Sequence, residues 1–216
     1  MRTACILLLG VSSLSAAAAQ TPVDPLDALF AQGRAAQASV TSIRAKFTET
    51  TVSSLLLQPV VAEGEVIGTK PIRVVMKYLT PVAKTVWLDA TRLVVVWPGR
   101  SDREEINITD MQKRVQQYFV DASAKELRQS FDIALSTDPS LHDADLLDMT
   151  PKRKQIKDGL SRLRLWVDPV RLVMVKMRMD YADGDVRTLE FHDIVLNAPV
   201  DERLFVIPPK SGRGGR

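Results

Sequence analysis

The residues that could perform catalysis or bind a metal are few, and their spacing does not suit either task. The chain has two histidines, and neither His142, in a polar segment, nor His192, on the charged side of an alternating run, belongs to a zinc-binding spacing. No G-x-S-x-G motif or glycine-rich phosphate loop is present. The carboxylate pairs Glu104–Glu105 and Asp143–Asp145 lie in polar segments that suit a solvated surface. We therefore expect no enzyme activity, no metal site and no cofactor.

The N-terminus has the composition of an export signal. Met1-Arg2 supplies positive charge, residues 6–11 form a short apolar core, and Ala17-Ala18-Ala19 fits an A-x-A cleavage site. That apolar core is too short to span a bilayer as a stable helix. The sole cysteine, Cys5, precedes it, so we expect neither a disulfide nor a lipid-modified cysteine in the mature chain. The prediction is a signal peptide over residues 1–19, cleaved near Ala19, and a soluble exported protein.

The rest of the sequence predicts one domain followed by a short tail. Acidic and basic residues are mixed, the net charge is +3, and no linker separates two hydrophobic cores, so we assign residues 20–209 to one domain. Residues 210–216 are rich in glycine and arginine, a composition typical of a disordered basic tail. Export argues against nucleic acid as a partner of this tail.

Two helices are expected within the domain. Asp24-Pro25 is a good N-terminal cap for a first helix reaching about Val40. Asp121-Ala-Ser123 caps a second, expected over Ala124–Leu135, in which Leu127, Phe131 and Leu135 form one stripe at four-residue spacing. A polar loop is expected over residues 136–145.

Between and after these helices the hydrophobic period is two, which indicates half-buried antiparallel strands. Hairpin and turn signals such as Asp183-Gly184 separate the runs. The expected strands cover residues 43–52, 65–67, 72–78, 85–88, 93–97, 163–167, 173–180, 189–191 and a closing strand over 204–207. A many-stranded sheet with one apolar face must curve around something. The residues leave two alternatives open: helices filling the concave face as a dry core, or a cavity that admits an acyl chain. Methionines such as Met76 and Met177 slightly favour the cavity, because their side chains adapt to ligands of variable shape.

Several local motifs, in this order and spacing, resemble the periplasmic outer-membrane lipoprotein carrier (LolA) family. Each is weak alone, and together they span nearly the whole mature chain. They are Ile43-Arg-Ala-Lys-Phe47-Thr-Glu-Thr, Gly64-Glu-Val-Ile-Gly-Thr-Lys70-Pro71, Ile72 to Pro81, Val86 to Leu93, Leu163 to Pro169, Val173 to Asp180, Asp183-Gly184, Leu189 to Phe191, Asn197, and Asp201 to Pro209.

The resemblance implies a mainly β (α+β) fold: an unclosed, curved antiparallel β half-barrel with helices covering a hydrophobic cavity. It implies that the cavity is lined by Val74, Met76, Val86, Val95, Leu127, Phe131 and Leu135. In the family an arginine before a proline helps to hold the helical lid shut. The matching residue here is Lys70, which lacks the planar guanidinium fork, so we expect a weaker lid latch at Lys70 with a contribution from Arg73. Met76 replaces a tryptophan of the family.

The function that the resemblance implies is a monomeric periplasmic carrier that ferries lipoprotein acyl chains from the inner to the outer membrane. Its partners would be the acyl chains or another lipid, an inner-membrane release complex and an outer-membrane acceptor protein. The absence of a lipid-modified cysteine favours the soluble carrier over the membrane-anchored acceptor. The alternatives are a carrier of another envelope lipid or glycolipid, and an envelope protein-binding or sensing module of the same fold. A charge at Phe131 is expected to abolish acyl-chain binding while leaving the fold largely intact.

Overall fold

The computed structural model describes residues 24–70, 72–100, 103–109 and 123–209, and the predicted signal peptide and tail lie outside them. The described residues form an 11-stranded antiparallel sheet, in the order β6-β5-β4-β3-β2-β1-β11-β10-β9-β8-β7. The strands are β1 (Ser42–Val52), β2 (Val60–Thr69), β3 (Arg73–Thr80), β4 (Lys84–Leu88), β5 (Arg92–Val96), β6 (Arg103–Asn107), β7 (Phe131–Asp138), β8 (Ala144–Pro151), β9 (Leu160–Val167), β10 (Met174–Tyr181) and β11 (Val186–Leu196).

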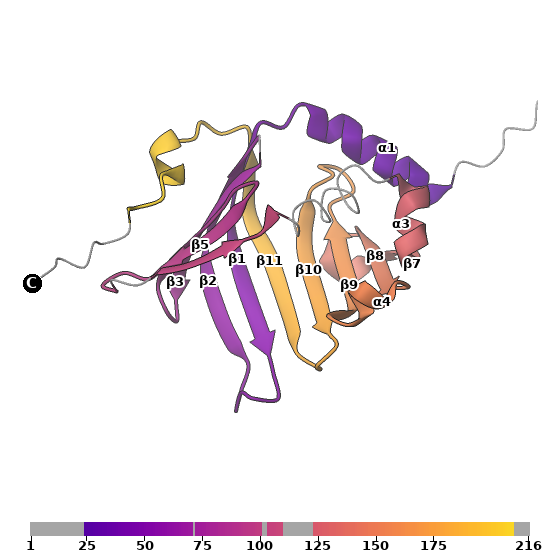
Figure 1. The fold of residues 1–216 in the computed structure, drawn as a ribbon. Coiled ribbons are helices and arrows are strands. Elements are labelled where there is room, and N and C mark those ends of the chain that lie inside the picture. The colour runs from indigo at the N-terminus through magenta and orange to yellow at the C-terminus, as the bar shows by residue number, and fades with distance from the viewer. Residues whose placement is uncertain (1–23, 71, 101–102, 110–122, 210–216) are drawn as a thin grey trace, which may run out of the picture.

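The sheet consists of two meanders joined at the centre. Strands β1 to β6 follow one another, as do β7 to β11, and the pairing of β1 with β11 unites the two halves. Strands β6 and β7 form the two edges, so the sheet is not closed into a barrel. It curves beneath α1 (Pro25–Ala38), which crosses above it (Figure 1). The predicted unclosed antiparallel half-barrel is therefore confirmed.

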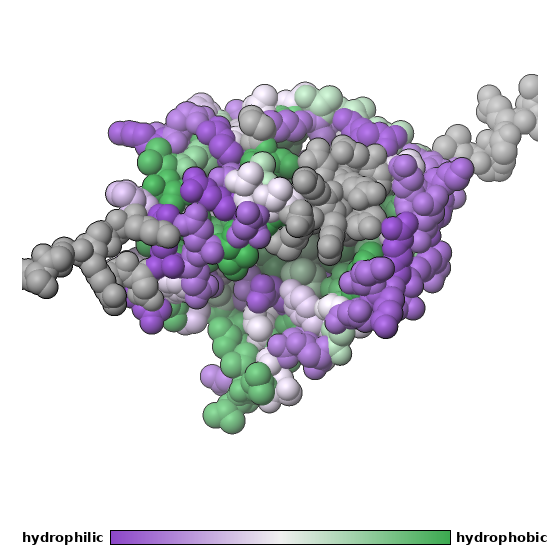
Figure 2. Space-filling view, in the orientation of Figure 1, coloured by the Kyte–Doolittle hydropathy of each residue, from purple (hydrophilic) through white to green (hydrophobic). Residues whose placement is uncertain are grey.

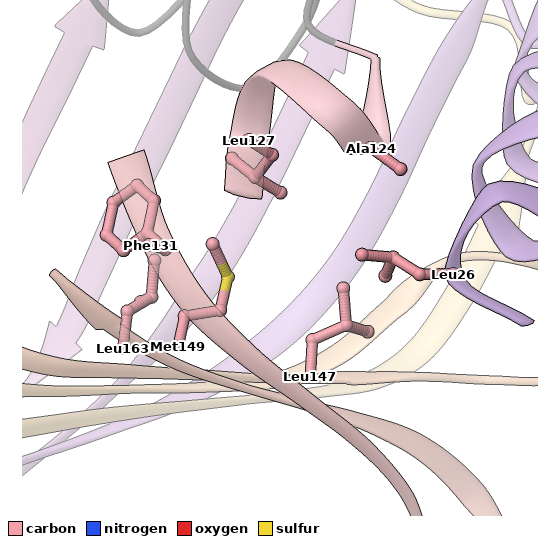
Figure 3. Close-up of a cluster of buried hydrophobic side chains, with 7 residues drawn as sticks. All are labelled: Leu26, Ala124, Leu127, Phe131, Leu147, Met149 and Leu163. Atoms are coloured by element: carbon pink, nitrogen blue, oxygen red, sulfur yellow. The ribbon is translucent and has the colours of Figure 1, made fainter. Parts of the chain in front are cut away.

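Helices α1 and α3 (Ala124–Ser130) pack against one half of the sheet. Their residues Leu26, Ala124 and Leu127 point toward side chains of β7, β8 and β9, and together they form a buried cluster of Leu26, Ala124, Leu127, Phe131, Leu147, Met149 and Leu163 (Figure 3). The short helix α4 (Lys154–Lys157) follows β8 and lies near β8 and β9. Among the described residues, no helix is both long and apolar enough to cross a membrane.

The predicted second helix is too long. Helix α3 ends at Ser130, and Phe131 begins the edge strand β7. A spacing of four residues places side chains on one face in a helix and equally in a strand, so the stripe from Leu127 to Leu135 did not distinguish the two. The expected polar loop over residues 136–145 is also wrong. Strand β7 continues to Asp138 and β8 starts at Ala144, with the 3-10 turn η2 (Pro139–Leu141) between them.

The predicted closing strand over residues 204–207 is also wrong. The segment begins with a 3-10 helix, η3 (Glu202–Phe205), whose Asp201 carboxylate accepts a hydrogen bond from the Arg203 backbone N–H at 3.0 Å. Its alternation resembles that of a strand, but it lies across the sheet and is held by side chains. Strand β6 was missed because its sequence, Arg-Glu-Glu-Ile-Asn, is almost entirely polar, and β8 because it follows the misassigned loop.

Candidate functional site

An apolar face runs from β5 to β2 and from β7 to β11, and strand register joins the two parts through Ala45 and Phe47 of β1. In β2 to β5, Val66, Met76, Val86 and Val95 lie opposite one another in a single row. In the other half, the row Leu135, Leu147, Leu165, Met177 and Leu189 crosses β7 to β11 and continues to Glu49 of β1. Since side chains alternate between faces along a strand, this register assigns the predicted site residues to one face.

The predicted site residues separate into two groups on this face. Leu127 and Phe131 are buried in the cluster of the β7–β9 half, and Leu135 packs against that cluster. Val74, Met76 and Val86 are only half-buried, and Val95 is buried at 8% exposure. The described helices that contribute to the packed core do so in the β7–β9 half. One half of the face is therefore a helix-packed core, and Val74, Met76, Val86 and Val95 line the other.

A polar cluster lies on the same face, at the end of β1 where the chain turns into β2. The Tyr78 hydroxyl donates a hydrogen bond to the Glu49 carboxylate at 2.9 Å, and the Arg187 guanidinium lies 3.7 Å from the other Glu49 oxygen. The Lys84 ammonium stands 4.3 Å from the centre of the Tyr78 ring. Burial, reinforced by the Glu49 charge, raises the pKa of Tyr78 well above its ordinary value. These groups line a cavity of about 410 Å³ together with apolar side chains of Leu56, Val60, Val82 and Trp97.

Lys70, the predicted lid latch, contacts helix α1. Its ammonium donates a hydrogen bond to the backbone carbonyl of Gln37, in the last turn of the helix. A cation at this end also interacts favourably with the helix dipole. Asn197 supports the same junction: its side-chain oxygen accepts from the Thr41 backbone N–H at 2.8 Å, and its amide donates to the Ser39 carbonyl at 3.1 Å. The backbone of Asn197 has φ = 58°, a conformation that asparagine tolerates better than most residues.

The other end of α1 is held by Asp24. Its carboxylate caps the helix by accepting from the Leu26 backbone N–H at 2.9 Å, and it also accepts from the Arg128 guanidinium of α3 at 2.8 Å. The Arg128 hydrogen bond lowers the pKa of Asp24. Helix α3 has its own capping box, in which Ser123 and Glu126 exchange hydrogen bonds. Asp24 thus ties the two helices to each other.

Arg73 has a different environment from Lys70. Its guanidinium forms two hydrogen bonds with the Glu202 carboxylate, at 2.6 and 3.1 Å, and stacks 4.6 Å from the centre of the Phe205 ring. Both partners belong to the C-terminal segment, and among the described contacts Arg73 has none with α1. The structure therefore brings Arg73 to the C-terminal segment, and Lys70 to the helix.

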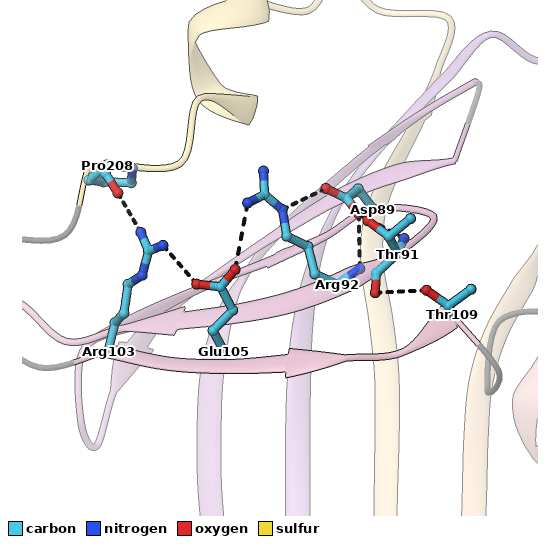
Figure 4. Close-up of polar contacts among 7 residues, drawn as sticks. All are labelled: Asp89, Thr91, Arg92, Arg103, Glu105, Thr109 and Pro208. Atoms are coloured by element: carbon cyan, nitrogen blue, oxygen red, sulfur yellow. Dashed lines mark hydrogen bonds and ion pairs between the residues drawn. The ribbon is translucent and has the colours of Figure 1, made fainter.

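The C-terminal segment is also attached to the edge of the sheet. The Trp87 indole donates to the Leu204 carbonyl at 2.9 Å. Arg103 of β6 donates to the Pro208 carbonyl at 2.7 Å and pairs with Glu105, which also lies near Arg92 (Figure 4). Trp87 alternates with Val86, so this segment covers the outer face of β3 to β5, away from the row of site residues.

A larger cavity, of about 560 Å³, lies at the opposite end of the strands. Its lining includes Lys176, Glu190 and His192. These residues alternate with Met177, Leu189 and Phe191, so they belong to the outer face. Phe191 of the apolar face also contributes to the lining, but none of the predicted site residues does.

An unclosed, curved antiparallel sheet with helices packed on one apolar face defines the half-barrel class of binding proteins. The sequence profile of the family described as outer membrane lipoprotein carrier protein LolA matches residues 38–208. The chain belongs to this family, as its motifs predicted. Members of the family are carriers or binding proteins of the periplasm or envelope rather than enzymes. Among curated proteins, no sequence matches the chain.

Solved structures show the same fold at low sequence identity. An uncharacterized conserved protein from Thermus thermophilus matches with a TM-score of 0.53 and 8% identity, over 84% of this chain and 93% of that one. MucB in the Pseudomonas aeruginosa MucA/MucB complex matches with a TM-score of 0.52 and 15% identity, over 84% of this chain and 61% of that one. The Mycobacterium tuberculosis lipoprotein LppX matches with a TM-score of 0.50 and 15% identity, over 82% of this chain and 97% of that one. At these identities the likeness shows the fold alone.

Sequence reasoning missed several residues of the apolar face. Phe47 is 1% exposed and meets Tyr78 edge to face, with ring centres 4.9 Å apart. The alternation of Phe47 with charged residues was recognised from the sequence, but its contact with Tyr78 across β2 was not. The pair of Glu49 and Tyr78 gave no local signal, because the two residues are 29 positions apart. Only the register of β1, β2 and β3 brings them together.

Proposed function

We propose that this protein is an exported periplasmic carrier that shields acyl chains of lipoproteins on the apolar face of its sheet. The observation that carries the proposal is the continuous apolar face, of which the described helices pack into a core over only one half. The row of Val66, Met76, Val86 and Val95 offers aliphatic and thioether surface without a charged side chain. Each methylene that leaves water for such a surface contributes about 0.8 kcal/mol, so a multi-chain lipid binds tightly without specific polar contacts.

The polar cluster fits one end of such a ligand. Glu49, Tyr78, Lys84 and Arg187 lie where the apolar face meets the β1–β2 loop, in the cavity of about 410 Å³. A lipid whose chains lie along the apolar rows would place its polar end beside these groups. Opposite charges side by side accommodate a zwitterionic or amide-containing end better than a bare anion.

In this proposal the chain collects its cargo from an inner-membrane release complex and delivers it to an outer-membrane acceptor protein. Helix α1, held through Lys70 and Asp24, acts as the lid over the apolar face. Release then requires a partner that moves α1 or offers the acyl chains a better site. Support for this role comes from the family match.

Lipid analysis of the protein, purified from the periplasm without detergent, tests the proposal. We expect acylated peptides or lipoproteins to co-purify. Recovery of a different envelope lipid would redirect the cargo. Protein recovered without lipid but with a bound envelope protein would replace the carrier by a protein-binding module, which the likeness to MucB in its MucA complex supports.

A pair of variants locates the binding face. Met76→Asp places a carboxylate in the row of site residues, and we expect it to abolish co-purification of lipid. Lys77→Asp places the same group on the opposite face of the same strand, where the side chain is exposed, and we expect normal lipid content. Phe131 does not serve this purpose, contrary to the expectation from sequence. It is 1% exposed within the core cluster, so a charge there would unfold the domain.

A further inference from the structure

The loop between β1 and β2 exposes three consecutive leucines. Leu55 is 91% exposed, Leu56 39% and Leu57 108%. The loop is nevertheless ordered by its own hydrogen bonds: the Leu56 backbone N–H donates to the Ser53 carbonyl at 3.1 Å, and that of Leu55 to the Ser53 hydroxyl at 3.2 Å. Leu55 and Leu57 are thus held almost fully in solvent, while Leu56 is partly covered.

These leucines belong to a wider apolar tip. Val52, Val60 and Val61 of the flanking strands are also exposed, as are Leu79 and Val82 beside the neighbouring β3–β4 turn. No charged residue occurs from Thr50 to Ala62. In the space-filling view the tip is a hydrophobic projection below β1 and β2 (Figure 2). We call these eight residues the apolar tip: Val52, Leu55, Leu56, Leu57, Val60, Val61, Leu79 and Val82. A contiguous exposed apolar surface of this kind marks an interaction site.

The shape and charge of the tip indicate which partner it fits. Eight residues on the β1–β2 hairpin and the neighbouring β3–β4 turn fall short of the roughly 20–30 residues per side that a stable protein interface uses. A bilayer needs no complementary partner surface and accepts a convex apolar wedge. Charges behind the tip are of both signs, with Lys84 and Arg187 opposed by Asp183 and Asp185 of the β10–β11 turn, so they give no net attraction to an anionic surface.

We propose that the apolar tip inserts into the surface layer of a lipid bilayer, driven by hydrophobic burial rather than by charge. Leu56, Val60 and Val82 of the tip also line the cavity of about 410 Å³ that contains Glu49 and Tyr78. A tip seated in lipid therefore places the opening of this cavity at the membrane surface. Membrane docking of this kind does not depend on which cargo the apolar face holds.

Flotation with phosphatidylcholine vesicles tests the proposal, using the chain that results from export of the full-length precursor. We expect the wild-type protein to float with the vesicles. Leu55→Ser/Leu57→Ser should lower the partition coefficient about tenfold or more, because each leucine no longer gains from burial in lipid. The fold should be unaffected, because both side chains contact solvent only. Val170→Ser is the matched control: Val170 is 87% exposed, but it lies in the β9–β10 loop at the opposite end of the strands.

The remaining outcomes each oppose the proposal. Equal flotation of wild type and Leu55→Ser/Leu57→Ser, or no flotation of either, would overturn it. Binding that appears only with anionic lipid, or that disappears in high salt, would show an electrostatic contact instead. Self-association of the wild type that the double variant abolishes would identify the tip as a contact between copies. Met76→Asp is expected to float normally, so the cargo proposal and the membrane proposal fail independently.

Discussion

At the scale of single residues, close packing around Gly64 shapes the apolar face. The Phe47 ring lies directly over this glycine, and a Cβ at residue 64 would stand 2.7 Å from the ring and even closer to the Lys77 carbonyl. Gly64 opposes Phe47 on one side and Tyr78 on the other. The absence of a side chain at residue 64 therefore allows the two rings to meet above β2.

Gly64→Ala should lower the free energy of unfolding by about 1–3 kcal/mol, because the backbone carbonyl cannot yield and the ring must shift. Gly33→Ala is the control. Gly33 lies in α1 with open space around it, so alanine there should stabilise the protein by up to about 1 kcal/mol through its higher helix propensity. Urea denaturation of both variants measures these changes. Equal effects at the two positions would contradict the packing argument.

The buried Tyr78 hydroxyl makes stability depend on alkaline pH. Its pKa is raised above the ordinary value of 10.0 by burial and by Glu49. As pH rises, the unfolded chain therefore loses this proton first, and the free energy of unfolding falls above about pH 10. Tyr78→Phe should remove this part of the alkaline decline. At neutral pH it should destabilise the protein by about 1–3 kcal/mol, because Glu49, whose side chain is 12% exposed, loses its donor. Urea denaturation from pH 7 to 11 gives both values.

At the scale of elements, α1 is attached mainly at its two ends. Replacing Lys70 with methionine should accelerate amide hydrogen exchange in the last turn of α1, because the Gln37 carbonyl loses its charged donor. Arg73→Met should leave exchange in α1 unchanged and accelerate it in residues 202–205, where Glu202 and Phe205 contact Arg73. Mass spectrometry of exchanged peptides separates the two regions. If both variants loosened α1 alike, the division of roles between Lys70 and Arg73 would be wrong.

The elements also show which parts of the fold the sequence reveals. Runs with strict alternation and clear turns, such as β9 and β10, were predicted closely, because alternating charged and apolar residues indicate a half-buried strand. Only the middle of β11 was predicted. The boundary at Phe131 was not, since even spacing suits both a helix and a strand. The end at Ser130 depends on tertiary contacts, with Phe131 pairing opposite Pro151. For the site, alternation identified Met76 and Val86, but the link from Leu189 to Glu49 required the pairing of β1 with β11, which no local pattern encodes.

At the scale of the whole molecule, the sheet should unfold as one unit. The pairing of β1 with β11 joins residues such as Phe47 and Phe191 across the two meanders. If one meander unfolded, the other would therefore lose the strand that pairs with its central edge. Trp87 and Trp97 report on the first half and Trp166 on the second. In Trp87→Phe/Trp97→Phe, fluorescence follows Trp166, and in Trp166→Phe it follows the other two.

Within each of these variants, we expect the fluorescence midpoint in urea to coincide with that of far-ultraviolet circular dichroism. Coincidence in both would establish cooperative unfolding across the seam between β1 and β11. Separate midpoints would instead show that the two meanders unfold independently, and that their pairing contributes little to stability.

The attachment of α1 has a consequence for how the protein responds to its surroundings. The helix inserts only Leu26, with partial contributions from Leu29 and Phe30, into the core cluster. Those residues all lie in its first half, next to the Asp24–Arg128 pair, whereas the second half is held by Lys70 and Asn197. The two ends of α1 are therefore attached differently: the N-terminal end by apolar packing around Leu26, and the C-terminal end by hydrogen bonds. A partner that binds the Gln37 carbonyl, or competes for Lys70, would release the C-terminal end of α1 while the N-terminal end stays packed around Leu26. The direction of opening is thus built into the uneven distribution of apolar residues along one helix.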